Sequence, residues 1–163
     1  MRVLGLDPGL TCAGYGLVEQ KDGAISAIDY GAIRTPQGPV PHRLELLYDE
    51  IRALLARHSP DAVSVERVLF NANVRTATSV GQAAGIALLA AAQAGCEVAE
   101  YSPNEMKQTV AGYGAADKGQ VQLMISKLLG LKSIPKPADA ADALGLAITH
   151  LQARKLRRLA ARA

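Results

Sequence analysis

The sequence changes between two hydrophobic periods, and their order along the chain is the feature that most limits its possible folds. Three strand-like segments come first, at residues 2–6, 12–20 and 24–34, and an Asp22-Gly23 hairpin signal joins the last two. Helical and strand-like segments then alternate. This order predicts one α/β domain with a mixed five-stranded sheet, antiparallel at the start and parallel later, flanked by helices.

The later segments supply the remaining strands and helices. We expect an amphipathic helix between residues 43 and 57, because apolar residues recur there at helical spacing. The other expected elements are strands at 61–65 and 97–101 and helices at 73–94, 103–111, 117–130 and about 138–156. With 163 residues and no internal repeat, the chain is expected to form one domain over 1–152, followed by a basic C-terminal tail over 153–163.

The composition favours a core built without disulfides or zinc. Hydrophobic residues make up 49% of the chain, which has no Trp and one Phe, so the core is mostly aliphatic. Cys12 and Cys96 form no CxxC or Cys/His cluster, and no secretory leader pattern is evident, so we expect free thiols and a cytoplasmic protein. The uncharged run 76–96 is rich in Ala and Gly, which favours a buried helix over a membrane span.

The helix expected at 73–94 is apolar on both sides. Gly81 and Ala84 lie on one stripe, while Ala83 and Ala87 make the other side apolar as well. A second copy of the chain could cover this helix at Gly81 or Ala84, which predicts a homodimer. The alternative is a central helix covered by its own chain.

Charge is divided unevenly along the sequence. Residues 1–105 hold 8 Lys/Arg and 12 Asp/Glu, whereas residues 106–163 hold 10 and 3, a net charge of +7 for this last third. Such a basic segment suggests a polyanionic partner. A solvated basic face without a partner is the alternative.

Four carboxylates stand where chemistry could use them. Asp7 and Glu66 end strand-like segments, and the carboxyl ends of parallel strands meet at one edge of a sheet, where ligands bind. Asp139 and Asp142 are three residues apart on one helical face. Carboxylates this close repel unless a proton or a cation lies between them, which predicts a hard-cation site for Mg²⁺ or Mn²⁺. Taken singly, each carboxylate could instead be a turn, surface or capping residue.

Other catalytic patterns find no support in the sequence. There is no Walker-type phosphate loop and no strand-linked dinucleotide fingerprint, and the glycines of Gly14-Tyr15-Gly16 are interpreted as bends. The three histidines are scattered, so a Ser/His triad is not indicated. His150, two helical turns beyond Asp142, could line the same face.

The carboxylates and their context resemble the RuvC family of Holliday junction resolvases, in the ribonuclease H-like superfamily. The resemblance rests on Asp7-Pro8-Gly9 after the first strand, Glu66 after a later strand, and Asp139/Asp142 in PADAADALGLAITH. It extends over residues 1 to about 152 and includes the GQAAG stretch and Lys107-Gln108. It implies that Asp7, Glu66, Asp139 and Asp142 are both the catalytic residues and the metal ligands. Some family members carry His where Asp142 stands.

The resemblance also implies a function. It suggests a homodimeric, metal-dependent endonuclease that resolves four-way DNA junctions by paired cuts during recombination and repair. Two Mg²⁺ or Mn²⁺ ions per active site would support in-line hydrolysis to 5′-phosphate and 3′-hydroxyl ends. The expected partners are the DNA junction, a second copy of the chain and the RuvA-RuvB branch-migration complex, with no membrane.

Further residues are assigned to DNA binding. The family's important lysines fall on Lys107 and Lys118, and Arg75 is expected to contact phosphates as well. In the family an aromatic side chain in the loop after the catalytic Glu holds the junction centre. Here Leu69 occupies the position where some members carry that aromatic, so either Leu69 or the neighbouring Phe70 takes this role, and Phe70 is our candidate. The sequence leaves open whether the basic tail contacts DNA.

Two alternatives belong to other functional classes. Sugar-kinase or actin-like ATPases also begin with a three-stranded meander and an Asp-x-Gly turn, but they need two such domains, and 163 residues leave no room for them. A noncatalytic junction-binding module would be expected to lack one of the four carboxylates, and all four are present.

Overall fold

A five-stranded mixed sheet forms the centre of the computed structural model, which describes residues 1–68 and 74–161, and only the backbone of 74–76. The strand order is β3-β2-β1-β4-β5, with bounds β1 Arg2–Asp7, β2 Cys12–Lys21, β3 Ala24–Arg34, β4 Ala62–Glu66 and β5 Glu97–Tyr101. β1, β2 and β3 pair antiparallel, whereas β1, β4 and β5 pair parallel. The predicted mixed sheet is confirmed.

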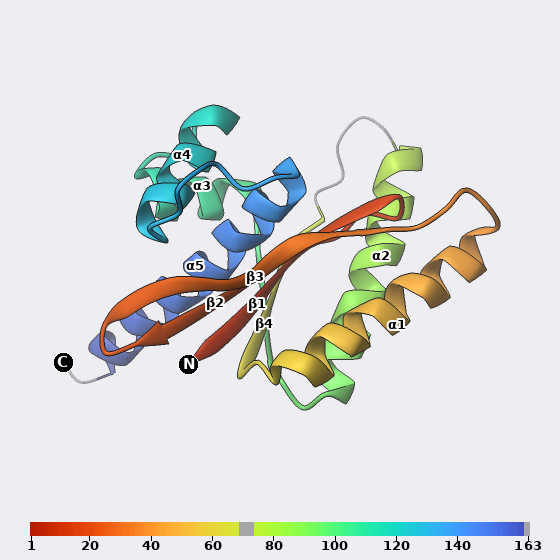
Figure 1. Ribbon diagram of the computed structural model, residues 1–163, viewed down its shortest axis with the longest axis horizontal. Coiled ribbons are helices and arrows are strands. Elements are labelled where there is room, and N and C mark those ends of the chain that lie inside the picture. Colours follow the sequence, from red (N-terminus) through yellow and green to blue (C-terminus); the bar gives the residue numbers. More distant parts are fainter. Residues whose placement is uncertain (69–73, 162–163) are drawn as a thin grey trace.

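Helices cover both faces of this sheet (Figure 1). α1 and α2 lie on one face, and α5 crosses the other, with α3 and α4 packed against α5. Their bounds are α1 Val40–His58, α2 Val74–Gln93, α3 Pro103–Ala111, α4 Lys118–Leu128 and α5 Ala138–Ala160. α5 thus continues past residue 156, while the division of the chain at residue 152 stays a prediction. Within the described part of the chain, no helix is long and apolar enough to span a membrane.

The β2–β3 connection follows the expected hairpin chemistry. Asp22 and Gly23 both have positive φ angles, 51° and 85°. A two-residue hairpin turn that matches the right-handed twist of its strands needs positive φ at both positions, and Asp-Gly tolerates this well. The turn therefore follows from the local sequence.

Alternation along β1 divides its side chains between two cores. Leu4 and Leu6 are buried in the core formed with α1 and α2, whereas Val3 is buried in the core formed with α5. Because side chains two residues apart in a strand share a face, Gly5 and Asp7 point to the same side as Val3. The last residue of β1 is therefore a carboxylate on the α5 side of the sheet.

Glycines let the backbone of α5 lie directly against β1 and β2. Gly5 pairs with Gly16 across the two strands. A Cβ atom added at Gly5 would stand 1.9 Å from the Ala143 carbonyl oxygen, and one at Gly14 would stand 2.0 Å from the Asp139 carbonyl oxygen. The interpretation of Gly14 and Gly16 as bends was wrong, because both lie within β2, where their missing side chains make room for the helix.

Among the described residues, α2 is covered on one side only. Ala84 is 5% exposed and belongs to the core formed with α1. Gly81 and Gly85 face open space, and Leu89 is 49% exposed. Ala84 is therefore not available for a subunit contact, because the helical turn points it into the core. The outer face of Gly81, Gly85 and Leu89 is the side left for a partner.

The glycine contact predicts a sharp effect of one methyl group. We expect Gly5→Ala to lower the free energy of unfolding by about 1–3 kcal/mol or more, because overlap with the α5 backbone cannot be relieved by a side-chain rotation. Gly114→Ala is the control, since its Cβ would come only within 3.9 Å of the Asn104 carbonyl oxygen. Denaturant unfolding measures both. A Gly5→Ala protein as stable as Gly114→Ala would contradict this account of α5 packing.

Candidate metal centre and active site

Two parallel strands bring Asp7 and Glu66 to the same edge of the sheet. β1 and β4 are neighbours, with Leu6 opposite Val65, so the next residues along the two strands, Asp7 and Glu66, stand side by side. Ala62 is buried in the core formed with α5, and Glu66, four residues on, shares its face. Both carboxylates therefore point toward α5, and the prediction that the two lie together at one edge of the sheet is confirmed.

The first turns of α5 complete the cluster. Asp139 and Asp142 lie three residues apart on one face of the helix. Carboxylate oxygens of Asp7, Asp139 and Asp142 all lie within 4.8 Å of one another. Glu66 lies beside this group and is joined to it by a side-chain hydrogen bond with Asp7. All four predicted carboxylates are thus brought together.

The shared volume makes the ionised form of Asp7 unfavourable. Burial, followed by repulsion from Glu66, Asp142 and Asp139, raises the pKa of Asp7 to about 8. Burial and the charge of Asp142 also raise the pKa of Glu66. Each shift has the cause expected for anions held together with little water. The site therefore favours a bound proton or cation.

One lysine already supplies positive charge at the edge of the cluster. Lys118, the first residue of α4, places its ammonium 3.0 Å from a carboxylate oxygen of Asp142. This hydrogen bond raises the pKa of Lys118, so the side chain stays charged. The sequence placed Lys118 among the DNA-binding residues, and the structure adds its direct contact with a candidate metal ligand.

Cys12 is a site residue that the sequence analysis did not assign. Its thiol donates a hydrogen bond to the Asp139 carboxylate over 3.2 Å. Burial raises the pKa of Cys12, so the sulfur keeps the proton that this bond needs. The alternation of β2 carried a signal, because Cys12 shares its face with Gly14 and Gly16, which both pack on α5.

The donor set fits a hard divalent cation. Three carboxylate oxygens lie within reach of one ion, and a fourth carboxylate is adjacent. Mg²⁺ and Mn²⁺ prefer such oxygen ligands, whereas zinc sites usually use Cys and His. A cation here would neutralise the repulsion that raises the pKa of Asp7.

The remaining predicted residues do not all fall in this cluster. Lys107 is half-buried on α3. Arg75 lies on α2, but its side chain is outside the described residues, as are Leu69 and Phe70. His150 does not face the carboxylates: it is fully buried, with Nδ1 within 3.1 Å of the Tyr101 hydroxyl.

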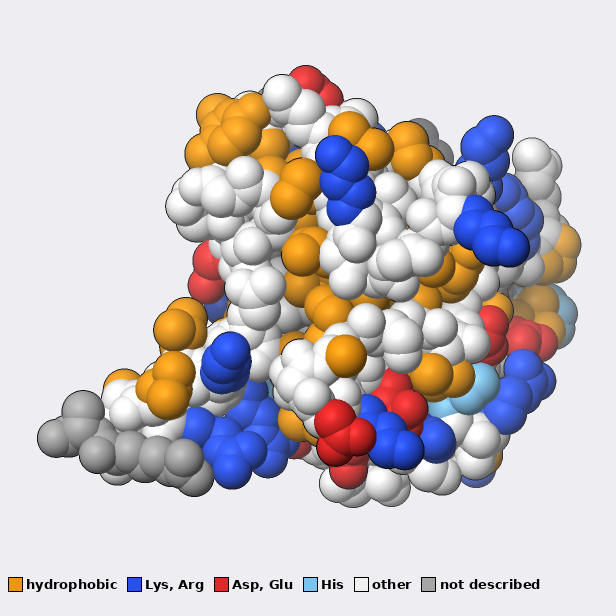
Figure 2. Space-filling view, turned by 60° about the vertical axis from the view of Figure 1, so that its left-hand side comes forward, with side chains coloured by type: hydrophobic (Ala, Val, Ile, Leu, Met, Phe, Trp, Pro, Cys, Tyr) orange, Lys and Arg blue, Asp and Glu red, His pale blue; other side chains and the backbone are white. Residues whose placement is uncertain are grey.

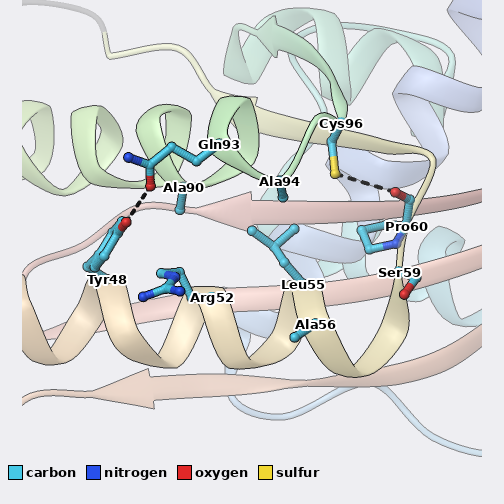
Figure 3. A pocket seen from close by; sticks show the side chains of 10 residues that line it. All are labelled: Tyr48, Arg52, Leu55, Ala56, Ser59, Pro60, Ala90, Gln93, Ala94 and Cys96. Atoms are coloured by element: carbon cyan, nitrogen blue, oxygen red, sulfur yellow. Dashed lines mark hydrogen bonds between the residues drawn. The ribbon is translucent and has the colours of Figure 1, made fainter.

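A separate cavity lies on the opposite face of the sheet, between the C-terminal halves of α1 and α2 (Figure 3). Tyr48 and Gln93 bridge its rim by a hydrogen bond, and the Cys96 thiol donates to the Pro60 carbonyl oxygen. Its charged side chain is Arg52, which lies over the Tyr48 ring. Its lining residues include no Asp, Glu or His, so it offers none of the acid–base groups of the carboxylate cluster.

Comparison with known proteins decides the family. The sequence profile described as crossover junction endodeoxyribonuclease RuvC matches residues 3–150. The chain belongs to the RuvC family. It is therefore an endodeoxyribonuclease, an enzyme that hydrolyses phosphodiester bonds, and this decides against both the ATPase and the noncatalytic alternatives.

RuvC proteins from several bacteria are similar over nearly the whole chain. A RuvC from Syntrophomonas wolfei is 52% identical over 157 residues, which cover 96% of this chain and 91% of the relative. One from Chloroflexus aggregans is 53% identical, covering 92% of both. The structure of T. thermophilus RuvC in complex with Holliday junction substrate superimposes with a TM-score of 0.90 at 38% identity, covering 96% of both chains. The fold is thus that of RuvC.

The crowded carboxylates predict a pH-dependent stability. The folded protein holds the pKa of Asp7 at about 8 instead of 3.8, so the metal-free fold loses stability as pH rises through this interval. Asp7→Asn removes that loss. We expect its melting temperature to exceed that of the unsubstituted protein by more at about pH 8 than at about pH 5, and added Mg²⁺ to narrow the difference.

The control for this measurement is Asp49→Asn, which neutralises an exposed carboxylate on α1. Its melting temperature should follow that of the unsubstituted protein at both pH values. If Asp7→Asn behaves in the same way, Asp7 is not under the repulsion described above.

Proposed function

We propose that this protein resolves four-way (Holliday) DNA junctions by paired phosphodiester cuts during recombination and repair. The observation that carries the proposal is the group of four carboxylates, with Asp7 and Glu66 from strand ends and Asp139 and Asp142 from α5. It occurs in a chain of the RuvC family, one of whose members was solved with a Holliday junction substrate. The group of carboxylates and the membership of the RuvC family thus support the same function.

The centre is proposed to hold two Mg²⁺ or Mn²⁺ ions. The ions would be held by Asp7, which is repelled by all three other carboxylates, together with Glu66, Asp139 and Asp142. When bound, the ions supply an activated water and stabilise the leaving 3′ oxygen of an in-line displacement, which gives 5′-phosphate and 3′-hydroxyl ends.

The surrounding residues are proposed to orient the ligands and the DNA. The thiol of Cys12 fixes one oxygen of Asp139, and the Lys118 ammonium holds Asp142 while offering its remaining protons to a phosphate. Lys107 and Arg75 are assigned to backbone phosphates. Phe70 is assigned to the junction centre, where a ring can stack on bases freed from pairing, and Leu69 is the alternative.

Paired cuts require two active sites. We propose a homodimer that forms through the outer face of α2, where Gly81 and Gly85 allow close approach and Leu89 is exposed. A symmetric contact of this kind would present two centres to the two strands of one junction. We also propose that the dimer acts with the RuvA-RuvB branch-migration complex.

A cleavage assay on defined DNA tests the proposal. A synthetic four-way junction, a matched duplex and a Y-shaped fork are incubated with the protein, with and without Mg²⁺. We expect symmetric nicks in the junction, only in the presence of the ion. Equal cutting of the duplex, or cutting in the presence of a chelator, would contradict the proposal.

Substitution of the carboxylates separates cleavage from binding. We expect Asp7→Asn, Glu66→Gln and Asp139→Asn each to abolish cleavage, because each removes a charged ligand. Junction affinity should stay near that of the unsubstituted protein or increase, since repulsion of the phosphates falls. Asp49→Asn should retain full cleavage. Near-normal turnover in any of the three site variants would overturn the assignment of that residue.

A bulky charge on α2 tests the dimer. We expect Gly85→Arg to fold normally, because the added side chain points into open space in a single copy of the chain. In a dimer the same side chain would meet the second copy, so the variant should be monomeric and unable to make paired cuts. Ala53→Arg, on the exposed side of α1, is the matched control and should stay dimeric. Light scattering and the ratio of paired to single nicks give the result. A native protein that is monomeric at micromolar concentration would refute this interface.

A further inference from the structure

The C-terminal part of α5 extends beyond the core and carries exposed leucines. Leu151 is the last fully packed side chain of the helix, at 3% exposed. Leu156 and Leu159, three residues apart and so on neighbouring positions of the helix surface, are 67% and 54% exposed. Nothing in the described fold covers them.

Two grooves flank this part of the helix. One, of about 580 Å³, runs beside the start of β1 and is lined by Arg154, Lys155, Arg158 and Leu159 among others. The second, of about 510 Å³, runs beside the β2–β3 hairpin, and Ile25, Lys155, Leu156 and Leu159 are among its lining residues. Lys155 and Leu159 border both grooves, so the two form one continuous surface. We call it the C-terminal groove surface, defined by Ile25, Lys155, Leu156, Arg158 and Leu159.

This surface combines apolar area with positive charge. Figure 2 shows Lys and Arg side chains gathered next to hydrophobic ones near the C-terminal end of the chain. The Arg154 guanidinium forms an ion pair with the Glu97 carboxylate over 2.9 Å. Lys155 and Arg158 are exposed and make no ion pair with any described residue. The one acidic residue of the first groove, Asp61, accepts a hydrogen bond from the Arg2 backbone amide.

We propose that the C-terminal groove surface binds an acidic amphipathic segment of a partner protein. Leucine-type side chains of the segment would occupy the groove beside the β2–β3 hairpin, against Leu156 and Leu159, and its carboxylates would pair with Lys155 and Arg158. A mainly apolar groove beside the β2–β3 hairpin, next to a more polar groove that carries the basic side chains, complements this chemistry on both counts. A DNA backbone would satisfy the cations but offers nothing to the leucines, and a second copy of the same basic surface would be repelled.

The position of the surface allows binding and cleavage together. Leu159 lies 17 residues beyond Asp142 on one continuous helix, which places it about 25 Å from the carboxylate cluster. A segment bound there leaves the carboxyl edge of the sheet open to DNA. The surface thus suits a protein that recruits or positions the nuclease, and the inference does not depend on the metal centre.

A designed peptide provides the test. The probe is a fluorescent helical peptide with leucines along one face and glutamates along the other. Its two controls replace all glutamates by glutamine, or all leucines by serine. Anisotropy with the full-length protein measures affinity, and amide chemical shifts locate the contact. We expect only the parent peptide to bind, with shifts concentrated at Ile25 and residues 151–159.

Paired substitutions then test each half of the surface. L156S with L159S, and separately K155E with R158E, should each weaken peptide binding by at least about tenfold, because one removes the apolar contact and the other the charge. The control, L123S with K132E, changes an exposed leucine and an exposed lysine elsewhere and should have no effect. Equal melting temperatures confirm that all three proteins fold.

Three outcomes would overturn the proposal. The first is equal binding of the serine-substituted peptide, which would show attraction by charge alone. The second is that K155E with R158E loses affinity for duplex DNA or for vesicles of anionic lipid, while L156S with L159S binds the parent peptide as tightly as the unsubstituted protein does. The third is the absence of peptide binding up to about millimolar concentration.

Discussion

The direct contact between the α5 backbone and β1 and β2 is the constraint on which the rest of the structure depends. It exists because Gly5, Gly14 and Gly16 present no side chains on that face, so carbonyl groups of the helix reach the sheet itself. On its other side, Gly145 lets Met106 and Ile125 approach the same helix. α5 is therefore held between the sheet and the α3–α4 pair with little freedom to shift.

That position places the carboxylates of the cluster where they repel one another. Gly14 meets the backbone of Asp139 itself, and Gly14 is paired with Asp7 across the strands. The packing that stabilises α5 thus brings three aspartate side chains within 4.8 Å of one another. The fold overcomes this repulsion by the large apolar contact of α5 with the sheet, and a metal ion would remove much of it. The same glycines thus set both the packing of α5 and the positions of its two aspartates.

The two ends of α5 differ in chemistry for a physical reason. The N-terminal turns lie at the carboxyl edge of the parallel strands, where backbone ends and carboxylates converge on one volume. The C-terminal turns extend past the sheet, so their leucines have no core to enter and their basic side chains remain in solvent. One helix thus connects the carboxylate cluster to the surface that we assign to a protein partner.

The sequence by itself determined the elements and the carboxylates that form the cluster. Period-2 and period-3.6 patterns are local properties of the sequence, and they located the strands and helices of the described chain to within a few residues. The cluster was predicted from two carboxylates at strand ends, Asp7 and Glu66, and two on one helical face, Asp139 and Asp142. Only the tertiary structure showed that Gly14 and Gly16 are a packing surface, that Ala84 faces the core, that Cys12 bonds Asp139 and that Lys118 bonds Asp142. These contacts join residues far apart in the chain or depend on which side of an element meets its neighbour. Spacing within one segment carries no information on the distance and rotation at which two segments pack.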